Sequence, residues 1–102
     1  HYNNLWAPLA AYNGHLEIIK WCMYRRLPML RSMWYNAANY GHLHILEWGY
    51  ENNLITNSDT YILECAVNKK QRHILLWAQE KGYVWDSETE FWAKKKWPSM
   101  FI

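Results

Sequence analysis

A twelve-residue pattern that recurs along this chain restricts its possible folds more than any other feature. Residues 10–21 and residues 37–48 agree at most positions and lie 27 residues apart. A weaker third copy covers residues 66–77, offset by 29 residues from the second, and Ala93 opens a partial fourth copy. Self-similarity at a short fixed period is the signature of repeat architectures, in which similar units stack and share one core. The sequence therefore predicts a linear stack of similar units.

Each copy is predicted to form two short helices joined by a tight turn. The alanine pairs lie near the end of the first helix, where small side chains let neighbouring helices approach closely. Gly14 and Gly41 follow where a helix would end, because glycine reaches the left-handed conformation without steric cost. A broad apolar stripe at helical spacing then begins at Leu16 and again at Leu43. These patterns predict an all-α fold built from helical hairpins.

Turn signals separate the predicted units. Pro28 cannot continue a helix, and Gly82 is expected to close the third unit. Ser87 begins a capping-box pattern, so a last helix is expected to start at Ser87 and to stop before Pro98. The chain is expected to be one domain whose repeats cover approximately residues 5–30, 31–57, 58–86 and, as a partial copy, 87–102.

The composition is that of a globular protein, and it excludes several functional classes. The chain is 51% hydrophobic, and eight tryptophans and eight tyrosines supply apolar area for a core. A net charge of +2 is too small to favour nucleic acid or an acidic membrane. We expect neither a transmembrane segment nor a signal peptide. Because the chain begins with His1 rather than methionine, it is expected to be a fragment or a processed piece. Cys22 and Cys65 are expected to be free buried thiols in a reducing, intracellular compartment, cytoplasmic or nuclear.

Residues 9–20 resemble the core of the ankyrin repeat, in which Leu-Ala-Ala is followed two residues later by Gly-His-Leu-Glu. Residues 39–43 repeat the centre of that motif, and residues 83–86 resemble the tail between short ankyrin-like repeats. Such repeats are abundant in large DNA viruses and in some eukaryotic microbes. The resemblance implies an ankyrin-type helical-hairpin solenoid of about three repeats plus a partial fourth. For a viral source it implies action in the host cytoplasm.

The chain departs from the ankyrin pattern at several positions. Its period is 27 rather than about 33 residues, so the β-hairpin fingers of ankyrin repeats are expected to shrink to plain loops. Pro8 lies inside the first expected helix and is tolerated only if that helix begins close to it. Asn36 replaces a core leucine, and Gly49 interrupts a second helix. Lys70 stands where glycine is expected. A lysine in the left-handed conformation costs about 1 kcal/mol, so the sequence does not determine how that helix ends.

No residue pattern predicts catalysis, a metal or a cofactor. Catalytic triads, paired-carboxylate motifs, phosphate loops and dinucleotide fingerprints are missing from the sequence, and nothing marks either cysteine as a nucleophile. The histidines recur at equivalent repeat positions, which are too far apart to share one zinc ion. Four of them are expected to act structurally at the start of second helices: His15, His42, His44 and His73. The chain is therefore expected not to be an enzyme.

Aromatic and basic residues raise the possibility of nucleic-acid binding. Trp21, Trp48 and Trp77 recur at one repeat position and are conceivable as a base-stacking platform. Their place beside aliphatic residues favours a ladder inside the core instead. The basic clusters in residues 69–72 and 94–96 would contact phosphates, but near-neutral charge favours their reading as solvated surface. Nucleic-acid binding therefore remains a lesser alternative.

The ankyrin resemblance also implies a partner-binding face. In that family the two residues between Ala-Ala and Gly point toward the concave side. In this chain those positions are occupied by Tyr12, Asn13, Asn39, Tyr40, Asn68 and Lys69. Arg31, just before the expected cap Ser32, belongs to the same rim and would anchor an acidic partner. Tyrosine and asparagine are favoured at recognition surfaces, and they are equally ordinary at polar helix ends.

These observations favour a non-enzymatic protein–protein interaction module that binds a protein partner on its concave face. The alternative from the sequence is a structural or assembly segment of a larger repeat protein or particle. Such a segment would bury its tryptophan-rich ends against neighbours rather than bind a free partner.

Overall fold

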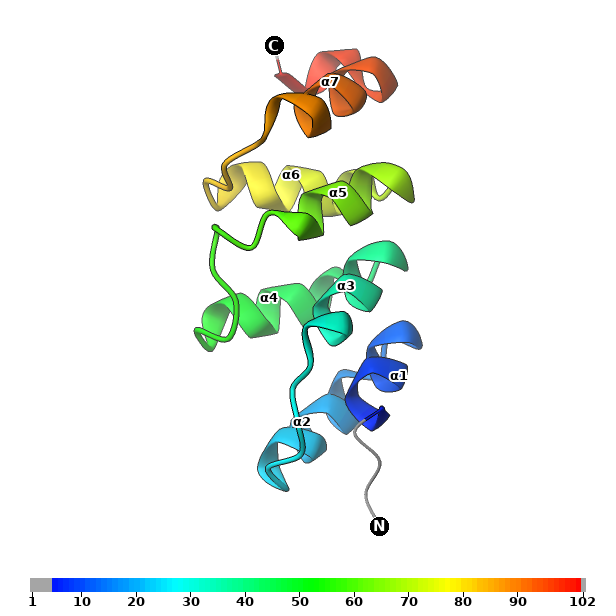
Figure 1. Ribbon diagram of the computed structural model, residues 1–102, viewed down its shortest axis with the longest axis vertical. Coiled ribbons are helices and arrows are strands. Elements are labelled where there is room, and N and C mark those ends of the chain that lie inside the picture. Colours follow the sequence, from blue (N-terminus) through cyan, green and yellow to red (C-terminus); the bar gives the residue numbers. More distant parts are fainter. Residues whose placement is uncertain (1–4, 102) are drawn as a thin grey trace.

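The computed structural model describes residues 5–101, and every element in that range is helical (Figure 1). Seven α-helices follow one another, and a 3-10 helix ends the described chain. The elements are α1 (Trp6–Tyr12), α2 (Leu16–Tyr24), α3 (Arg31–Asn39), α4 (Leu43–Glu51), α5 (Tyr61–Asn68), α6 (Arg72–Glu80), α7 (Ser87–Lys96) and η1 (Pro98–Phe101). The predicted all-α class is confirmed for these residues.

The helices form three hairpins that lie one above another along the long axis of the molecule (Figure 1). The first helices make one row, because α1 packs on α3, α3 on α5, and α5 on α7. The second helices α2, α4 and α6 lie in a row beside them (Figure 1). The molecule measures 48 × 22 × 18 Å, an elongated shape that follows when each unit contacts only its neighbours. In residues 5–101 the connections between hairpins are plain loops without strands, as the shortened period predicts.

One apolar seam joins the hairpins. The alanine pairs lie where first helices meet, and Ala11, Ala37 and Ala38 are fully buried. Their small side chains let the helix backbones come close, as the sequence predicts. The largest fully buried side chains fill the space around them: Ile19, Met33, Ile45, Leu46, Ile62, Leu63, Ile74 and Leu75. Each hairpin therefore completes the core of the next hairpin.

All six helices of the three hairpins close in the same way. The predicted ends at Gly14, Gly41 and Gly82 are confirmed, with φ of 74°, 77° and 74°. Three other residues take the same left-handed conformation at equivalent ends: Arg26, Asn53 and Lys70, with φ of 59°, 60° and 58°. In each case the following residue donates its N–H to the carbonyl five residues earlier, over 2.8–3.0 Å. This Schellman closure satisfies carbonyls that the helix leaves unpaired.

The end of α5 closes in the left-handed conformation although the residue there, Lys70, is strained by it. Replacing Lys70 with glycine is expected to raise the free energy of unfolding by about 1 kcal/mol, because a side chain at positive φ is strained. The matched control is Lys69→Gly, where φ is −99° and no such strain is released. Urea unfolding followed by circular dichroism measures both changes. A Lys70→Gly protein no more stable than the parent would contradict the strained closure.

The start of α3 differs from the prediction. The helix begins at Arg31 with Leu30 as its N-cap, and no side chain caps it. Ser32 is therefore inside the first turn and is not the cap that its residue type suggested. The capping preference of serine is worth only about 1 kcal/mol, so the packing of the neighbouring Met33, which is fully buried, decides the register.

The start of α7 is at Ser87 as predicted, but its cap is one residue earlier. The Asp86 carboxylate accepts hydrogen bonds from the Thr89 backbone N–H at 2.7 Å and from the Thr89 hydroxyl at 3.0 Å. A negatively charged cap also interacts favourably with the positive end of the helix dipole. The helix ends at Lys96, before Pro98, as predicted.

Three of the departures from the ankyrin pattern, those at Pro8, Asn36 and Gly49, have structural reasons. Pro8 is the third residue of α1, where its missing N–H breaks no helical hydrogen bond. The Asn36 side-chain amide donates to the Pro8 carbonyl at 2.9 Å and so links α3 to α1. Gly49 makes room for an aromatic ring, because a Cβ on Gly49 would lie 2.5 Å from Cζ3 of Trp34.

The three recurring tryptophans occupy equivalent positions in α2, α4 and α6 but differ in burial. Trp77 is 6% exposed and packs edge-on against Tyr50. Trp48 is half-buried, with its ring centroid 6.2 Å from that of Trp34. Trp21, in the first hairpin, is 37% exposed. The predicted burial in the core is therefore confirmed for Trp77, holds in part for Trp48, and is wrong for Trp21, which lies at the end of the stack.

Side chains at the start of the second helices connect neighbouring hairpins. Each donates from a side-chain nitrogen to a backbone carbonyl at the end of the previous first helix. The pairs are His42 to Tyr12 (3.0 Å), His44 to Gly14 (3.1 Å), Gln71 to Asn39 (3.0 Å) and His73 to Gly41 (2.9 Å). The structural role predicted for His42, His44 and His73 is confirmed. His15 is the N-cap residue of α2 but is exposed.

The two cysteines are free and buried, as predicted. Burial raises the pKa of Cys65 to about 11, and the nearby Glu64 charge adds to the effect. The reactive thiolate form is therefore scarce at neutral pH. Among residues 5–101 no three His, Cys, Asp or Glu side chains are grouped so that they could hold a metal ion. Over the same range, no helix combines the length and apolarity needed to cross a membrane.

Candidate protein-binding face

The predicted binding residues, apart from Arg31, lie at the last turns of α1, α3 and α5. These helices pack side by side with the same orientation (Figure 1), so their C-terminal ends form one edge of the row. The residues on this edge are Tyr12, Asn13, Asn39, Tyr40, Asn68 and Lys69. Arg31 is exposed at the opposite end of α3, about 12 Å along the helix axis from Asn39. The structure therefore does not bring Arg31 together with the others.

Two of the predicted residues come into contact. The ring centroids of Tyr12 and Tyr40 are 4.3 Å apart, and the rings are tilted by 52°. The side chains remain 47% and 43% exposed. They meet across neighbouring hairpins because Tyr12 ends α1 and Tyr40 caps the adjacent α3. This pair is an exposed aromatic surface of the kind that recognition sites use.

Two of the predicted asparagines take part in hydrogen bonds within the chain. The Asn13 side-chain amide donates to the Leu9 carbonyl at 3.0 Å within its own helix end. Asn39 is half-buried, and its backbone carbonyl accepts the bond from Gln71. Asn13 and Asn39 therefore support the edge of the row.

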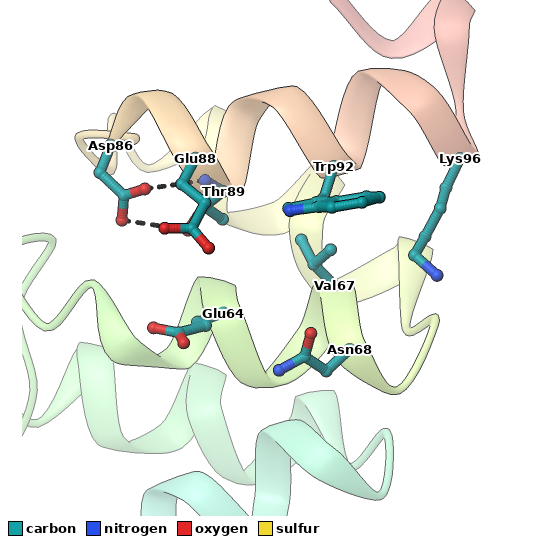
Figure 2. A pocket seen from close by; sticks show the side chains of 8 residues that line it. All are labelled: Glu64, Val67, Asn68, Asp86, Glu88, Thr89, Trp92 and Lys96. Atoms are coloured by element: carbon teal, nitrogen blue, oxygen red, sulfur yellow. Dashed lines mark hydrogen bonds between the residues drawn. The ribbon is translucent and has the colours of Figure 1, made fainter.

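A groove of about 420 Å³ lies between α5 and α7 (Figure 2). Glu64 and Asn68 face it from α5, and Glu88 and Trp92 face it from α7 (Figure 2). Its lining residues are Glu64, Val67, Asn68, Asp86, Glu88, Thr89, Trp92 and Lys96. Of the sequence-predicted site residues, only Asn68 lies in this groove.

Helical spacing explains why these side chains share one groove. Glu64 and Asn68 are one turn apart on α5, and Glu88, Trp92 and Lys96 follow one another by single turns on α7. Residues four apart lie on the same helix face. One turn after Thr89, which also lines the groove, Ala93 is fully buried. The groove is therefore set by two regular helix faces rather than by a loop.

The groove carries more negative than positive charge. Three carboxylates line it, those of Glu64, Asp86 and Glu88, against the single ammonium of Lys96. The ion pairs within residues 5–101 involve Lys20 with Glu17 and Lys94 with Glu90. Glu64 and Glu88 belong to neither pair, so their charges are available to a ligand.

The Asp86 carboxylate is held in its charged form. The Thr89 backbone N–H and then the Thr89 hydroxyl keep the pKa of Asp86 below its ordinary value. Because both carboxylate oxygens already accept hydrogen bonds, Asp86 contributes negative charge to the groove rather than a free acceptor. Glu64 and Glu88 are the groups with acceptor capacity to offer.

Two lysines of the last basic cluster, in α7, make contacts within the chain. Lys94 pairs with Glu90 at 3.9 Å and lies 5.5 Å from the centre of the Phe101 ring. Lys95 lies 5.7 Å from the centre of the Phe91 ring. Contacts of a lysine with an aromatic face are attractive. Lys94 and Lys95 therefore lie against aromatic rings of the same chain.

Sequence reasoning missed Glu64, Glu88 and Trp92. The available signal was the spacing of four residues within each helix, which places polar and aromatic side chains on one face. That signal does not reveal which two helices become neighbours. No family model, curated protein or solved structure matches the chain significantly, so the residues of the groove and of the tyrosine pair carry the functional inference.

Proposed function

We propose that this chain is an ankyrin-type solenoid of about three repeats plus a partial fourth, and that it acts as a non-enzymatic protein-binding module. The repeat pattern, the stacked hairpins and the Gly14 and Gly41 helix ends support the ankyrin-type assignment. The groove between α5 and α7 is the observation that carries the proposed function (Figure 2). Two buried free thiols agree with a reducing intracellular compartment.

The chemistry of the groove favours a basic side chain of the partner. Glu64 and Glu88 offer carboxylates from opposite walls, and the Trp92 indole, 46% exposed, lies next to them (Figure 2). An arginine guanidinium binds carboxylates through several parallel hydrogen bonds and also packs on aromatic faces. Lysine supplies the charge but lacks the planar shape. We therefore infer that an arginine of the partner occupies this groove.

The same charges disfavour nucleic acid at this site. Phosphates would approach the carboxylates of Glu64, Asp86 and Glu88, and like charges repel. The exposed tyrosine pair, Tyr12 with Tyr40, lies on the same row of first helices and offers a second contact for an extended partner segment.

Peptide binding tests the proposal directly. The probes are fluorescently labelled short peptides with one arginine among neutral residues, and the same peptides with neutral citrulline in its place. The double variant Glu64→Gln/Glu88→Gln is expected to bind arginine peptides at least about tenfold more weakly, since charge-assisted hydrogen bonds contribute roughly 1.5–3 kcal/mol. Fluorescence polarisation at two salt concentrations measures the affinities.

The matched control is Glu80→Gln, an exposed glutamate on α6 outside the groove, which is expected to leave affinity unchanged. Equal binding of arginine and citrulline peptides would refute the arginine site. Tyr12→Ala with Tyr40→Ala tests the second contact separately. Unchanged affinity of that variant for a longer captured partner would remove the tyrosine pair from the binding face.

A further inference from the structure

The first hairpin exposes apolar residues that the same positions bury elsewhere in the stack. Ile18 on α2 is 45% exposed, whereas its equivalents Ile45 and Ile74 are fully buried. Leu9 on α1 is 61% exposed, whereas Cys65, its equivalent in the third hairpin, is 5% exposed. Exposed apolar area of this extent at one end of a protein marks an interaction surface.

Leu9 and Ile18 border a groove of about 520 Å³ between α1 and α2. It is lined by Trp6, Leu9, Ala10, Asn13, His15, Glu17, Ile18 and Trp21. The residues of the second hairpin that are equivalent to these lining residues pack against the first hairpin. The groove is therefore the continuation, one unit earlier, of the interface that already joins hairpin to hairpin.

The polar contacts of that interface define what the next occupant must supply. Between the first two hairpins, Asn36, His42 and His44 donate to backbone carbonyls. In the first hairpin, the equivalent positions hold Leu9, His15 and Glu17. His15 retains a donor, Leu9 is apolar, and the Glu17 carboxylate is an acceptor where the internal interfaces have a donor.

We propose that this end of α1 and α2 docks a further helical hairpin of the same repeat type. The hairpin offers a backbone carbonyl to His15, an apolar side chain to Leu9 and an N–H or ammonium donor to Glu17. Within this chain the matching surfaces of the first two hairpins are already covered, since the carbonyls of Tyr12 and Asn39 accept bonds from the next hairpin. At the third hairpin α7 packs on α5. An additional hairpin is therefore the occupant that fits.

An extended chain tests this proposal. A copy of residues 31–57 is placed directly before Leu5, which gives a four-hairpin protein whose first junction resembles the natural loops in length. The added hairpin is expected to raise the urea midpoint and to slow amide hydrogen exchange in α1 and α2 at least tenfold. Ile18→Glu is expected to abolish this gain while leaving the stability of the 102-residue chain nearly unchanged, because Ile18 is exposed there.

Glu17→His provides the sharper comparison. In the four-hairpin protein the new imidazole would meet the copied Gly41 carbonyl, as His73 meets Gly41 in the parent. The variant is expected to raise the urea midpoint of the four-hairpin protein and not that of the 102-residue chain. Unchanged exchange in α1 and α2 on adding the hairpin would overturn the proposal. Dimerisation of the 102-residue chain that Ile18→Glu abolishes would also overturn it, in favour of a second copy.

Discussion

Truncation of Ile45 to alanine is expected to lower the free energy of unfolding by about 2–5 kcal/mol. Ile45 is fully buried in the middle of the stack, where α4 meets the hairpins on either side. The lost methyl and methylene groups leave a cavity that the surrounding helices fill only in part. Because a domain of this size is stable by only about 5–15 kcal/mol in total, the loss is a large fraction.

The repeat supplies a matched control for this prediction. Ile18→Ala removes the same atoms at the equivalent position of the first hairpin, but Ile18 is 45% exposed. Its truncation is expected to cost about 1 kcal/mol or less, since much of the side chain is already in water. Urea unfolding of both variants measures the difference. Equal losses at Ile18 and Ile45 would contradict the stacking of the hairpins.

The second large effect is expected at Gly49 in α4. On an exposed helix, glycine to alanine stabilises by about 1 kcal/mol. Here the new Cβ would lie 2.5 Å from Cζ3 and 2.6 Å from Cη2 of Trp34, whose ring is buried and cannot swing away. Gly49→Ala is therefore expected to destabilise by about 1–3 kcal/mol, the usual cost of overpacking.

The third hairpin shows how this loss is expected to be rescued. It carries Leu63 and Ala78 at the positions of Trp34 and Gly49, and both are buried. Adding Trp34→Leu to Gly49→Ala reproduces that combination, so the double variant is expected to be more stable than the sum of the two single changes predicts. A double-mutant cycle by urea unfolding measures the coupling. Strict additivity would show that the ring and the glycine do not depend on each other.

The candidate site was predictable only in part. The positions of Tyr12 and Tyr40 at helix ends followed from the repeat, and their contact follows from adjacent hairpins. Glu64 and Trp92 gave no comparable signal, because neither residue type recurs at the equivalent positions of the other units. Their meeting depends on the partial fourth unit, whose single helix lies over α5 (Figure 1).

The end residues of the stack show the same limit. Trp21 and Trp77 have equivalent places in the repeat, and the pattern alone assigns them the same burial. Trp77 packs against Tyr50 of the preceding hairpin, whereas Trp21 belongs to the first hairpin of the described residues, and their exposures are 6% and 37%. A repeat pattern describes the average unit, whereas burial depends on what lies beside each copy.

The amino-acid order by itself determined the helical hairpins, because helix ends and apolar stripes arise from interactions within about four residues along the chain. It also determined the closure at Gly14, Gly41 and Gly82. Only the tertiary structure decided which side chains meet, through bonds between residues 28–32 positions apart such as those of Asn36 and His73. Those contacts exist only once the units stack, and the same stacking leaves the groove between α5 and α7 and the exposed apolar residues of the first hairpin.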